Sequence, residues 1–347
     1  MLTAIYTILV FCLIIAIHEF GHFVVAKLCG MTVHEFAIGM GPKIIGHKGK
    51  KTDYTVRLLP IGGYVKLEGE DGESDDINAF CNKKPWQRFL VLFAGAFMNF
   101  VLGFIIFIII VASSGQIATN TIGNVIEDSS FHNAGIRKGD TVVYMESKNY
   151  NSSIDDYNDI NYFLSQSGDV ETTITFERDG KKFTKTLSPS FVAGYKDKMF
   201  GFSPKLEKTN IVNVPVAAYR QSKFVVKLVV DSFVGLITGK VPVSQLSGPV
   251  GIVNEIGNAA EEGMKSSFLD GLLNVMFLAA LISINLGVVN LFPLPALDGG
   301  RIVFVVIEWI RRKPIDRNKE GIVHFIGLVI LLLLMVFITF SDVLRIF

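Results

Sequence analysis

The sequence has little cysteine and little charge. Its three cysteines, Cys12, Cys29 and Cys81, form no C-x-x-C pair, and none lies between Gln116 and Pro204. This scarcity indicates neither a disulfide framework nor a cysteine-type zinc site. Charged residues make up 19% of the 347 residues and the net charge is +1, which gives no sign of nucleic-acid binding. Half of the residues are hydrophobic, which is typical of a membrane protein.

The first 28 residues lack two features of a cleaved signal peptide. No Lys or Arg precedes their apolar run, and no small-residue cleavage site follows it. The run is also longer than the apolar core of a typical signal peptide. We therefore expect a retained membrane helix.

Four apolar segments approach or exceed the roughly 20 residues that an α-helix needs to cross a bilayer. They cover about 2–27, 89–111, 268–291 and 322–340. After the third segment, Pro293 and Pro295 precede another apolar stretch, "IVFVVIEWI". Because proline breaks helices, we predict that this stretch is a separate re-entrant or interfacial piece.

The distribution of Lys and Arg predicts the orientation of the chain. The loop between the first two segments is rich in both residues, and the connection before the last segment reads "RRKPIDRNK". The positive-inside rule places both connections in the cytoplasm. Both termini and the long 115–265 segment then lie outside it, since large domains are translocated regardless of their own charge.

Two connecting regions have patterns of their own. Residues 116–205 contain polar turns and strand-like runs, including "VETTITFERDGKKFTKTL", a hairpin signal with "RDGK" as its turn. In the cytoplasmic loop, "DYTVRLLPIGGYVKLEG" predicts a hairpin around "PIGG". That hairpin is either an ordinary loop or an apolar element that dips into the membrane beside the first helix.

The stretch "KFVVKLVVDSFVGLI" is apolar but is interrupted by Lys227 and Asp231. An amphipathic helix on the membrane surface fits it better than a fifth crossing, although both interpretations stay open. The chain is thus predicted to have four parts. They are a first half of the membrane core (1–114), an extracytoplasmic domain (115–206), an interfacial connector (207–267) and a second half of the core (268–347).

The motif "HEFGH" places three ionisable residues inside the first apolar segment. His18 and His22 are four residues apart and project from one helix face, with Glu19 beside them. In this H-E-x-x-H arrangement two imidazoles hold zinc and the carboxylate acts on water. The alternative is a satisfied polar cluster in a helix bundle. A charged group at mid-membrane costs about 3 kcal/mol, so we favour a metal site.

A zinc site that keeps one position open for water needs a third protein ligand. His34, His47 and His132 lie in connecting regions, and we interpret His324, at the start of the last apolar segment, as a packing or interfacial residue. Asp298 in "NLFPLPALDGGR" is a carboxylate at membrane depth. We favour it as the third ligand, although by itself this stretch would be read as a loop leaving the membrane.

At these motifs the sequence resembles the intramembrane zinc metalloproteases of the site-2 protease type. That family pairs H-E-x-x-H on one membrane helix with N-x-x-P-x-x-x-x-D-G on another, here "HEFGH" (18–22) and "NLFPLPALDGG" (290–300). The sequence is most similar to the bacterial branch called regulator-of-sigma-E proteases. Further matches are "GMGP" (39–42), "RLLPIGGYVKLEG" (57–69), "AGAFMNF" (94–100) and "SGPVGI" (247–252). The third of these often has Pro where Ala96 stands here.

The 115–206 segment resembles a PDZ domain, because "NAGIRKGDTVVYMES" matches the core of that domain. The chain has room for one such domain. PDZ grooves bind extended peptides by adding a strand. The resemblance implies that the domain filters substrates; a simple structural spacer is the alternative.

Taken together, the resemblance implies an α-helical polytopic protein of the bacterial cell membrane. It would have about four transmembrane helices, a membrane-associated β-hairpin on the cytoplasmic side and an inserted, β-rich extracytoplasmic PDZ domain. It implies an enzyme that cleaves single-span membrane proteins near the cytoplasmic leaflet. Zn²⁺ would be held by His18, His22 and Asp298, and Glu19 would be the general base toward zinc-activated water.

The resemblance also names substrate-binding candidates. Asn290 resembles the family's substrate-contacting Asn, and Asn99 has a weaker claim because helix packing explains it equally well. Gly62, Gly63 and Tyr64 lie in the predicted hairpin, which would hold an unwound substrate by edge pairing. The partners implied are the lipid bilayer and membrane-spanning peptides such as anti-sigma factors, signal-peptide remnants or pheromone precursors.

Two other functions are weighed against proteolysis. One is a catalytically silent membrane scaffold whose PDZ domain recruits partners. The other is a metal transporter, which would need several ionisable residues along a path, whereas the sequence shows one compact cluster.

Overall fold

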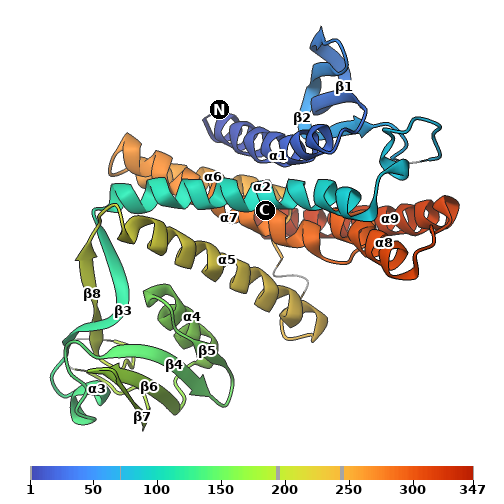
Figure 1. Ribbon diagram of the computed structural model, residues 1–347. Helices are drawn as coiled ribbons and strands as arrows, with labels where there is room; N and C mark the ends of the chain where they lie inside the picture. The colour runs from blue at the N-terminus through green and yellow to red at the C-terminus, as the bar shows by residue number, and fades with distance from the viewer. Residues whose placement is uncertain (1, 71, 193–195, 243–245, 347) are drawn as a thin grey trace. The chain divides into compact units, whose positions relative to one another are not determined.

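The computed structural model describes residues 2–70, 72–192, 196–242 and 246–346. The chain divides into two compact units, which are described separately (Figure 1). The first comprises residues 1–106 and 225–347, and the second residues 107–224.

Four long apolar helices form the candidate membrane spans: α1 (Leu2–Leu28), α2 (Pro85–Ser114), α7 (Phe268–Leu291) and α9 (Arg317–Ile346). Each has the length and apolar composition needed to cross a bilayer. The four predicted apolar segments are thereby confirmed as helices long enough to span a membrane, with α2 and α9 extending several residues beyond the expected limits. Few of the apolar side chains of α9 are buried, as expected for a helix that faces lipid.

The predicted break after the third span is also confirmed. α7 ends at Leu291, and α8 (Asp298–Arg311) begins after the segment that contains Pro293 and Pro295. Asp298 is therefore the first residue of a new helix. A carboxylate is favoured at this position because unpaired N–H groups and the helix dipole give the N-terminus partial positive charge.

α6 (Pro249–Met264) packs against α1, α7 and α9 within the first unit. It begins inside "SGPVGI", and its N-cap, Gly248, has no side chain to accept from the first amides. Asp342 of α9 replaces that cap. Its carboxylate, 2% exposed, accepts from the N–H groups of Gly248 and Gly251 at 3.2 and 2.8 Å. The last span thus satisfies amides that α6 leaves unpaired.

β1 (Val33–Lys48) and β2 (Asp53–Leu67) form a β-hairpin that packs on α1 (Figure 1). Both strands bend, β1 around Gly39 and Gly41 and β2 around Gly62, all with positive φ. The first half of β1 consequently lies between the two halves of β2. Residues 35–38 pair with 63–66 on one side and with 53–56 on the other.

The predicted hairpin closed by "PIGG" is therefore wrong in its pairing. The arms on either side of "PIGG" do not pair with each other, and the loop that joins β1 to β2 lies at 49–52. Local alternation correctly indicates that both arms are strands. It carries no information about the segment 35–38, which comes from earlier in the chain and separates them.

The second unit contains a sheet with strand order β7-β6-β4-β3-β8 and β5 paired to β4. Its strands are β3 (Gln116–Val125), β4 (Thr141–Ser147), β5 (Asn151–Ser153), β6 (Thr172–Arg178), β7 (Lys181–Leu187) and β8 (Phe202–Lys208). The predicted "RDGK" hairpin is confirmed as β6–β7, with Arg178 opposite Lys181 and positive φ at Asp179 and Gly180.

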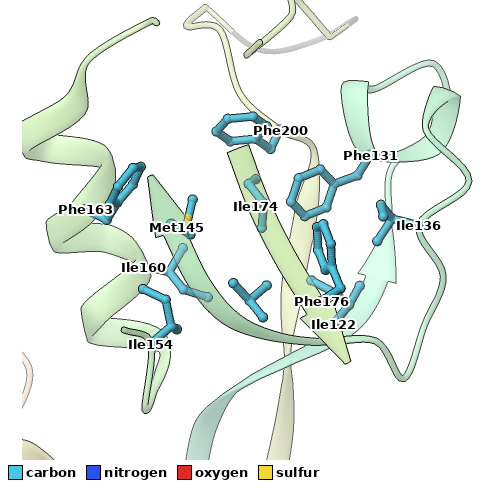
Figure 2. Packing of buried hydrophobic residues seen from close by; sticks show 11 residues of the cluster. Ile122, Phe131, Ile136, Met145, Ile154, Ile160, Phe163, Ile174, Phe176 and Phe200 are labelled. Atoms are coloured by element: carbon cyan, nitrogen blue, oxygen red, sulfur yellow. The ribbon is translucent and has the colours of Figure 1, made fainter. Parts of the chain in front are cut away.

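Figure 2 shows the core of this unit, where aromatic and aliphatic side chains from the sheet meet those of α4 (Tyr157–Ser167) and α3 (Ser130–Asn133). Phe131, Phe163 and Phe176 are among its fully buried side chains.

Two further helices complete the described elements. A short 3-10 helix, η1 (Phe80–Asn82), precedes α2. α5 (Asn213–Ile237) covers the stretch interrupted by Lys227 and Asp231 and is not among the four candidate spans of the described chain.

Asp140, in the "KGD" of the PDZ-like motif, is a buried anchor of the second unit. Its carboxylate is 1% exposed and accepts from Arg178 Nε and Nη2 at 2.6 and 2.7 Å and from the N–H of Arg137 at 2.8 Å. Burial opposes ionisation, but these donors outweigh it and lower the pKa of Asp140. The motif thus fixes the loop before β4.

We expect Asp140→Ala to destabilise the second unit by about 2–3 kcal/mol, because it removes a buried carboxylate that accepts three hydrogen bonds from Arg137 and Arg178. Hydrogen–deuterium exchange of the full-length protein should become faster across residues 115–206 and stay unchanged in the first unit. Asp169→Ala, at an exposed position of the same unit, is the matched control. Equal exchange in the two variants would contradict the assignment.

Candidate metal centre

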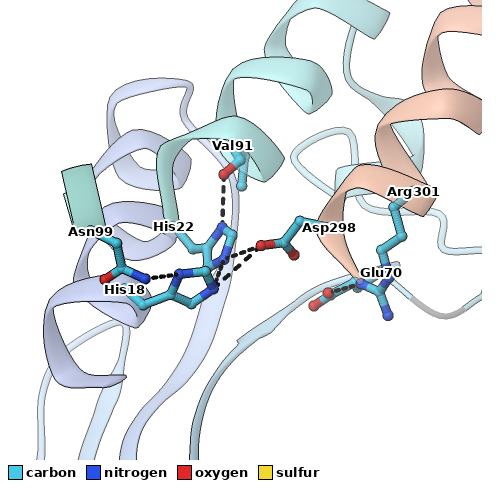
Figure 3. Close-up of polar contacts among 7 residues, drawn as sticks. All are labelled: His18, His22, Glu70, Val91, Asn99, Asp298 and Arg301. Carbon is cyan, nitrogen blue, oxygen red and sulfur yellow. Dashed lines mark hydrogen bonds and ion pairs between the residues drawn. The ribbon is translucent and has the colours of Figure 1, made fainter. Parts of the chain in front are cut away.

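The site is built from the second half of α1 and the first residue of α8. His18 Nε2 and His22 Nε2 lie 3.2 Å apart, and Asp298 Oδ2 lies 3.3 Å from the first and 3.4 Å from the second (Figure 3). The three side chains are only 11%, 12% and 19% exposed. Among the described residues this is the one group of three His, Cys, Asp or Glu side chains spaced to hold a metal ion.

The spacing of these three atoms fits zinc. Zinc bonds of about 2.0–2.1 Å in a tetrahedron place neighbouring ligand atoms about 3.3–3.4 Å apart, close to the distances found here. Asp298 Oδ2 is buried, and no hydrogen bond from a described residue satisfies it. Three atoms that carry lone pairs would repel one another at this range without a cation between them. These three side chains would hold zinc and leave its fourth ligand to be water or substrate.

The second ring nitrogen of His22 fixes its tautomer. Nδ1 lies 2.8 Å from the backbone carbonyl of Val91 in α2 and donates to it. A neutral imidazole protonated at Nδ1 keeps the Nε2 lone pair for a metal. Val91 thereby prepares His22 for coordination through its backbone alone.

Asn99, also in α2, holds the other imidazole. Its side chain is 0% exposed, and its amide lies 3.2 Å from His18 Nδ1. The amide oxygen has no hydrogen-bond partner among the described residues. Amide oxygen and nitrogen exchange places by a 180° rotation, and the rotated amide accepts from His18 Nδ1–H. That arrangement satisfies the orphaned oxygen and leaves His18 Nε2 free to coordinate.

Glycine lets α2 approach the two imidazoles. A Cβ at Gly95 would lie 2.3 Å from His22 Nε2 and 2.8 Å from His18 Cε1. On α1, a Cβ at Gly21 would lie 2.3 Å from the carbonyl oxygen of Ala94. These two glycines bring α1 and α2 close enough for the Val91 carbonyl to reach His22 and for the Asn99 amide to reach His18.

Two ion pairs hold α8, the helix that begins with Asp298. Arg301, one turn after Asp298, pairs with Glu70 (Figure 3). Further along, the buried Glu308 pairs with the buried Arg88 of α2. Each pair ties α8 to a segment that lies far away in the sequence.

Glu19 lies on the α1 face that packs against β2. A Cβ at Gly63 would be 3.0 Å from Glu19 Cγ, so the absence of a side chain at Gly63 makes room for the stem of Glu19. The half-buried carboxylate lies within electrostatic range of His18, His22 and Asp298. The predicted base therefore sits between the three candidate ligands and the β1–β2 sheet.

The remaining substrate-binding candidates lie in different settings. Tyr64 donates from its hydroxyl to Glu35 at 2.7 Å. Burial opposes ionisation of Glu35, but this bond and those from Thr55 and Arg57 lower its pKa to about 2. Gly62 forms the bend of β2. Asn290 is half-buried in the last turn of α7.

Several residues of this site are missed by sequence patterns. Gly95 falls within "AGAFMNF", but no spacing rule shows that a side chain there would strike two imidazoles. Val91 acts through its carbonyl, which leaves no trace in residue type. Asn99 was expected to contact substrate or to pack between helices, whereas here it contacts His18. The salt bridge between Glu70 and Arg301 joins two charged residues that carry no motif together.

Comparison with known proteins supports this chemistry. The model of the family described as "Peptidase family M50" matches residues 6–334. A protein of Clostridium acetobutylicum is 38% identical over 97% of this chain and 96% of its own length. A protein of Clostridium perfringens is 37% identical over 98% of both chains, and one of Staphylococcus aureus 30% identical over 100% of this chain and 99% of its own. All three bear the name "Putative zinc metalloprotease".

We expect Gly95→Ala to weaken zinc binding by at least about tenfold, because the new methyl group must displace the imidazoles. Competition with a chromogenic chelator measures the affinity in detergent. Gly321→Ala in α9 is the matched control, since a Cβ there meets nothing within 4 Å. Wild-type affinity in the Gly95 variant would show that α2 does not restrict the site.

Proposed function

Because this chain belongs to peptidase family M50 and is a zinc metallopeptidase of the membrane, we propose that it hydrolyses single-span membrane proteins inside the bilayer, near the cytoplasmic leaflet. The observation that carries this proposal is the triangle of His18, His22 and Asp298. His18 and His22 belong to the candidate span α1. Asp298 begins α8, the helix that follows the candidate span α7.

The residues divide the chemistry between them. His18, His22 and Asp298 hold zinc, which when bound acidifies water and polarises a peptide carbonyl. Glu19 accepts the proton of the attacking water on its carboxylate and delivers it to the nitrogen of the leaving amine. The small exposed fractions of the three ligands limit the contact of the site with bulk water.

A substrate helix hides its peptide bonds and must be unwound before hydrolysis. The segment 63–66 pairs with 35–38 on one side, and no strand in the described part of the chain pairs with its other side. An unwound substrate segment can add there as a further strand, with Gly62, Gly63 and Tyr64 along it and Glu19 beside it. Asn290 then supplies a side-chain amide for the exposed substrate backbone.

The tip of the β1–β2 sheet supports insertion into lipid. Its exposed side chains include the large apolar ones of Met40, Ile44, Ile45, Val56, Leu58 and Leu59, with Lys43 exposed among them. In water such a patch is unfavourable, whereas contact with acyl chains removes the cost. This sheet accordingly lies at the cytoplasmic side of the membrane and dips into it.

The second unit acts as a single PDZ-type filter outside the cytoplasm. A groove of about 220 Å³ runs between α4 and the start of β8, with Tyr157, Leu164, Phe200 and Phe202 in its wall. It suits an extended peptide with apolar side chains. Such a filter is consistent with membership of the regulator-of-sigma-E branch in the bacterial cell membrane, with membrane proteins already shortened outside the membrane as the proposed substrates.

Two other functions fit the structure less well. A silent scaffold needs no paired imidazoles with their lone pairs turned toward one carboxylate. A transporter needs a series of ion sites, whereas the described residues contain one group spaced for a metal.

We expect Glu19→Gln to reduce cleavage of a purified single-span substrate by about 10²–10⁴-fold, because the amide cannot accept the proton. The assay uses purified protein in detergent, and zinc content should equal that of the wild type. Glu262→Gln, at an exposed position of α6, is the control. Full cleavage by Glu19→Gln would reject the proteolytic assignment and favour the scaffold.

The proposed orientation predicts which cysteines react from outside the cell. In a cysteine-free variant, a membrane-impermeant maleimide should label Asp169→Cys in intact cells and Lys48→Cys only after lysis. Both positions are exposed, so accessibility depends on the side of the membrane. The reverse labelling pattern would overturn the orientation.

A further inference from the structure

The segment between α7 and α8 delivers Asp298 to the two histidines through an unfavourable backbone conformation. Ala296, two residues before Asp298, has a φ of +73°. Residues with a Cβ rarely adopt this left-handed conformation, because the Cβ approaches the neighbouring carbonyl. Something outside the segment must therefore stabilise it.

α9 supplies that stabilisation at two points. The N–H of Ala296 donates to Nδ1 of His324 at 2.9 Å. One turn further along α9, a Cβ at Gly327 would lie 2.3 Å from Cβ of Pro295, so the absence of a side chain there lets the segment rest directly on the helix. The ring of His324 also contacts the ring of Phe304 in α8, with 5.5 Å between centroids.

The hydrogen bond has a direct consequence for the start of α8. Once Ala296 is fixed, the next N–H, of Leu297, bonds to the carbonyl of Leu294 at 3.3 Å, and the carbonyl of Leu297 accepts from Gly300 at 3.1 Å. Asp298 lies inside this turn. A rotation at Ala296 would therefore move the carboxylate away from His18 and His22.

We propose that His324 is a positioning residue of the metal centre: it holds the left-handed turn at Ala296 and so keeps Asp298 within reach of zinc. It is not a ligand, because Nδ1 is committed to the backbone and its side chain is not part of the metal-spaced group. The inference rests on the proposed role of Asp298 as the third ligand. The fourth span, α9, provides no ligand, but through His324 it controls the position of Asp298.

The test separates the hydrogen bond from simple packing by means of two replacements of His324. His324→Asn keeps an acceptor at the δ position, whereas His324→Leu has apolar bulk and no acceptor. Zinc affinity is measured by chelator competition on the full-length protein in detergent. We expect His324→Leu to weaken zinc binding about 10- to 100-fold and His324→Asn to remain within about threefold of the wild type.

A second variant tests the strain at Ala296. Glycine adopts positive φ without penalty, so Ala296→Gly in the His324→Leu background should recover at least about half of the lost affinity on a logarithmic scale. A role confined to packing between α8 and α9 would not be rescued by this change. Absence of rescue, or equal losses in His324→Asn and His324→Leu, would overturn the proposal.

Asp298→Ala, measured in parallel, distinguishes this inference from the proposed function. If Asp298→Ala lowers zinc affinity and His324→Leu does not, the positioning role is rejected while the metal centre stands. Unchanged zinc affinity in Asp298→Ala would show that Asp298 is not a ligand, and the positioning role of His324 would then be rejected as well.

Discussion

The structure depends on one electrostatic constraint: three lone-pair-bearing atoms must point at one another inside an apolar helix bundle. Each imidazole meets this constraint only if its other nitrogen carries the proton. For His22 the hydrogen-bond acceptor is the carbonyl of Val91, and for His18 it is the side-chain oxygen of Asn99 once the amide is rotated. Both partners lie on α2, so the tautomers of residues on α1 are set by a neighbouring helix. The close approach of these helices at Gly21 and Gly95 follows from that requirement.

The third ligand poses a different problem, because it comes from a distant part of the chain. α8 is short and starts after a segment with two prolines, so its own hydrogen bonds do not fix its direction. Both members of the Arg88–Glu308 pair are buried, and the pair ties the last turn of α8 to α2. A buried ion pair contributes little net stability, but an unpaired partner is strongly disfavoured, so the pair can select one arrangement over others. Ion pairs thereby fix the position of α8, whereas close contacts at glycine fix the position of α2.

Much of this architecture could be predicted from sequence, because its signals are local. The four spans follow from hydropathy over about 20 residues, and the β6–β7 hairpin follows from "RDGK". Asp298 was favoured because the two histidines lacked a third ligand and Asp298 is a carboxylate at membrane depth. The pairing within β1 and β2 was not accessible in this way, since 35–38 enters between two strands that look contiguous in sequence. Contacts made by a backbone carbonyl, as at Val91, or by an absent side chain, as at Gly95, leave no pattern of residue types.

The cap of α6 by Asp342 has a consequence for how the protein is made. Asp342 follows all the other helices of the first unit in the sequence, so the ribosome has already synthesised α6 and the first three spans when this carboxylate emerges. Until α9 inserts, the amides of Gly248 and Gly251 lack this acceptor. Completion of the fold therefore waits for the last span, and a nascent chain that stalls before it would be open to quality-control proteases at the start of α6.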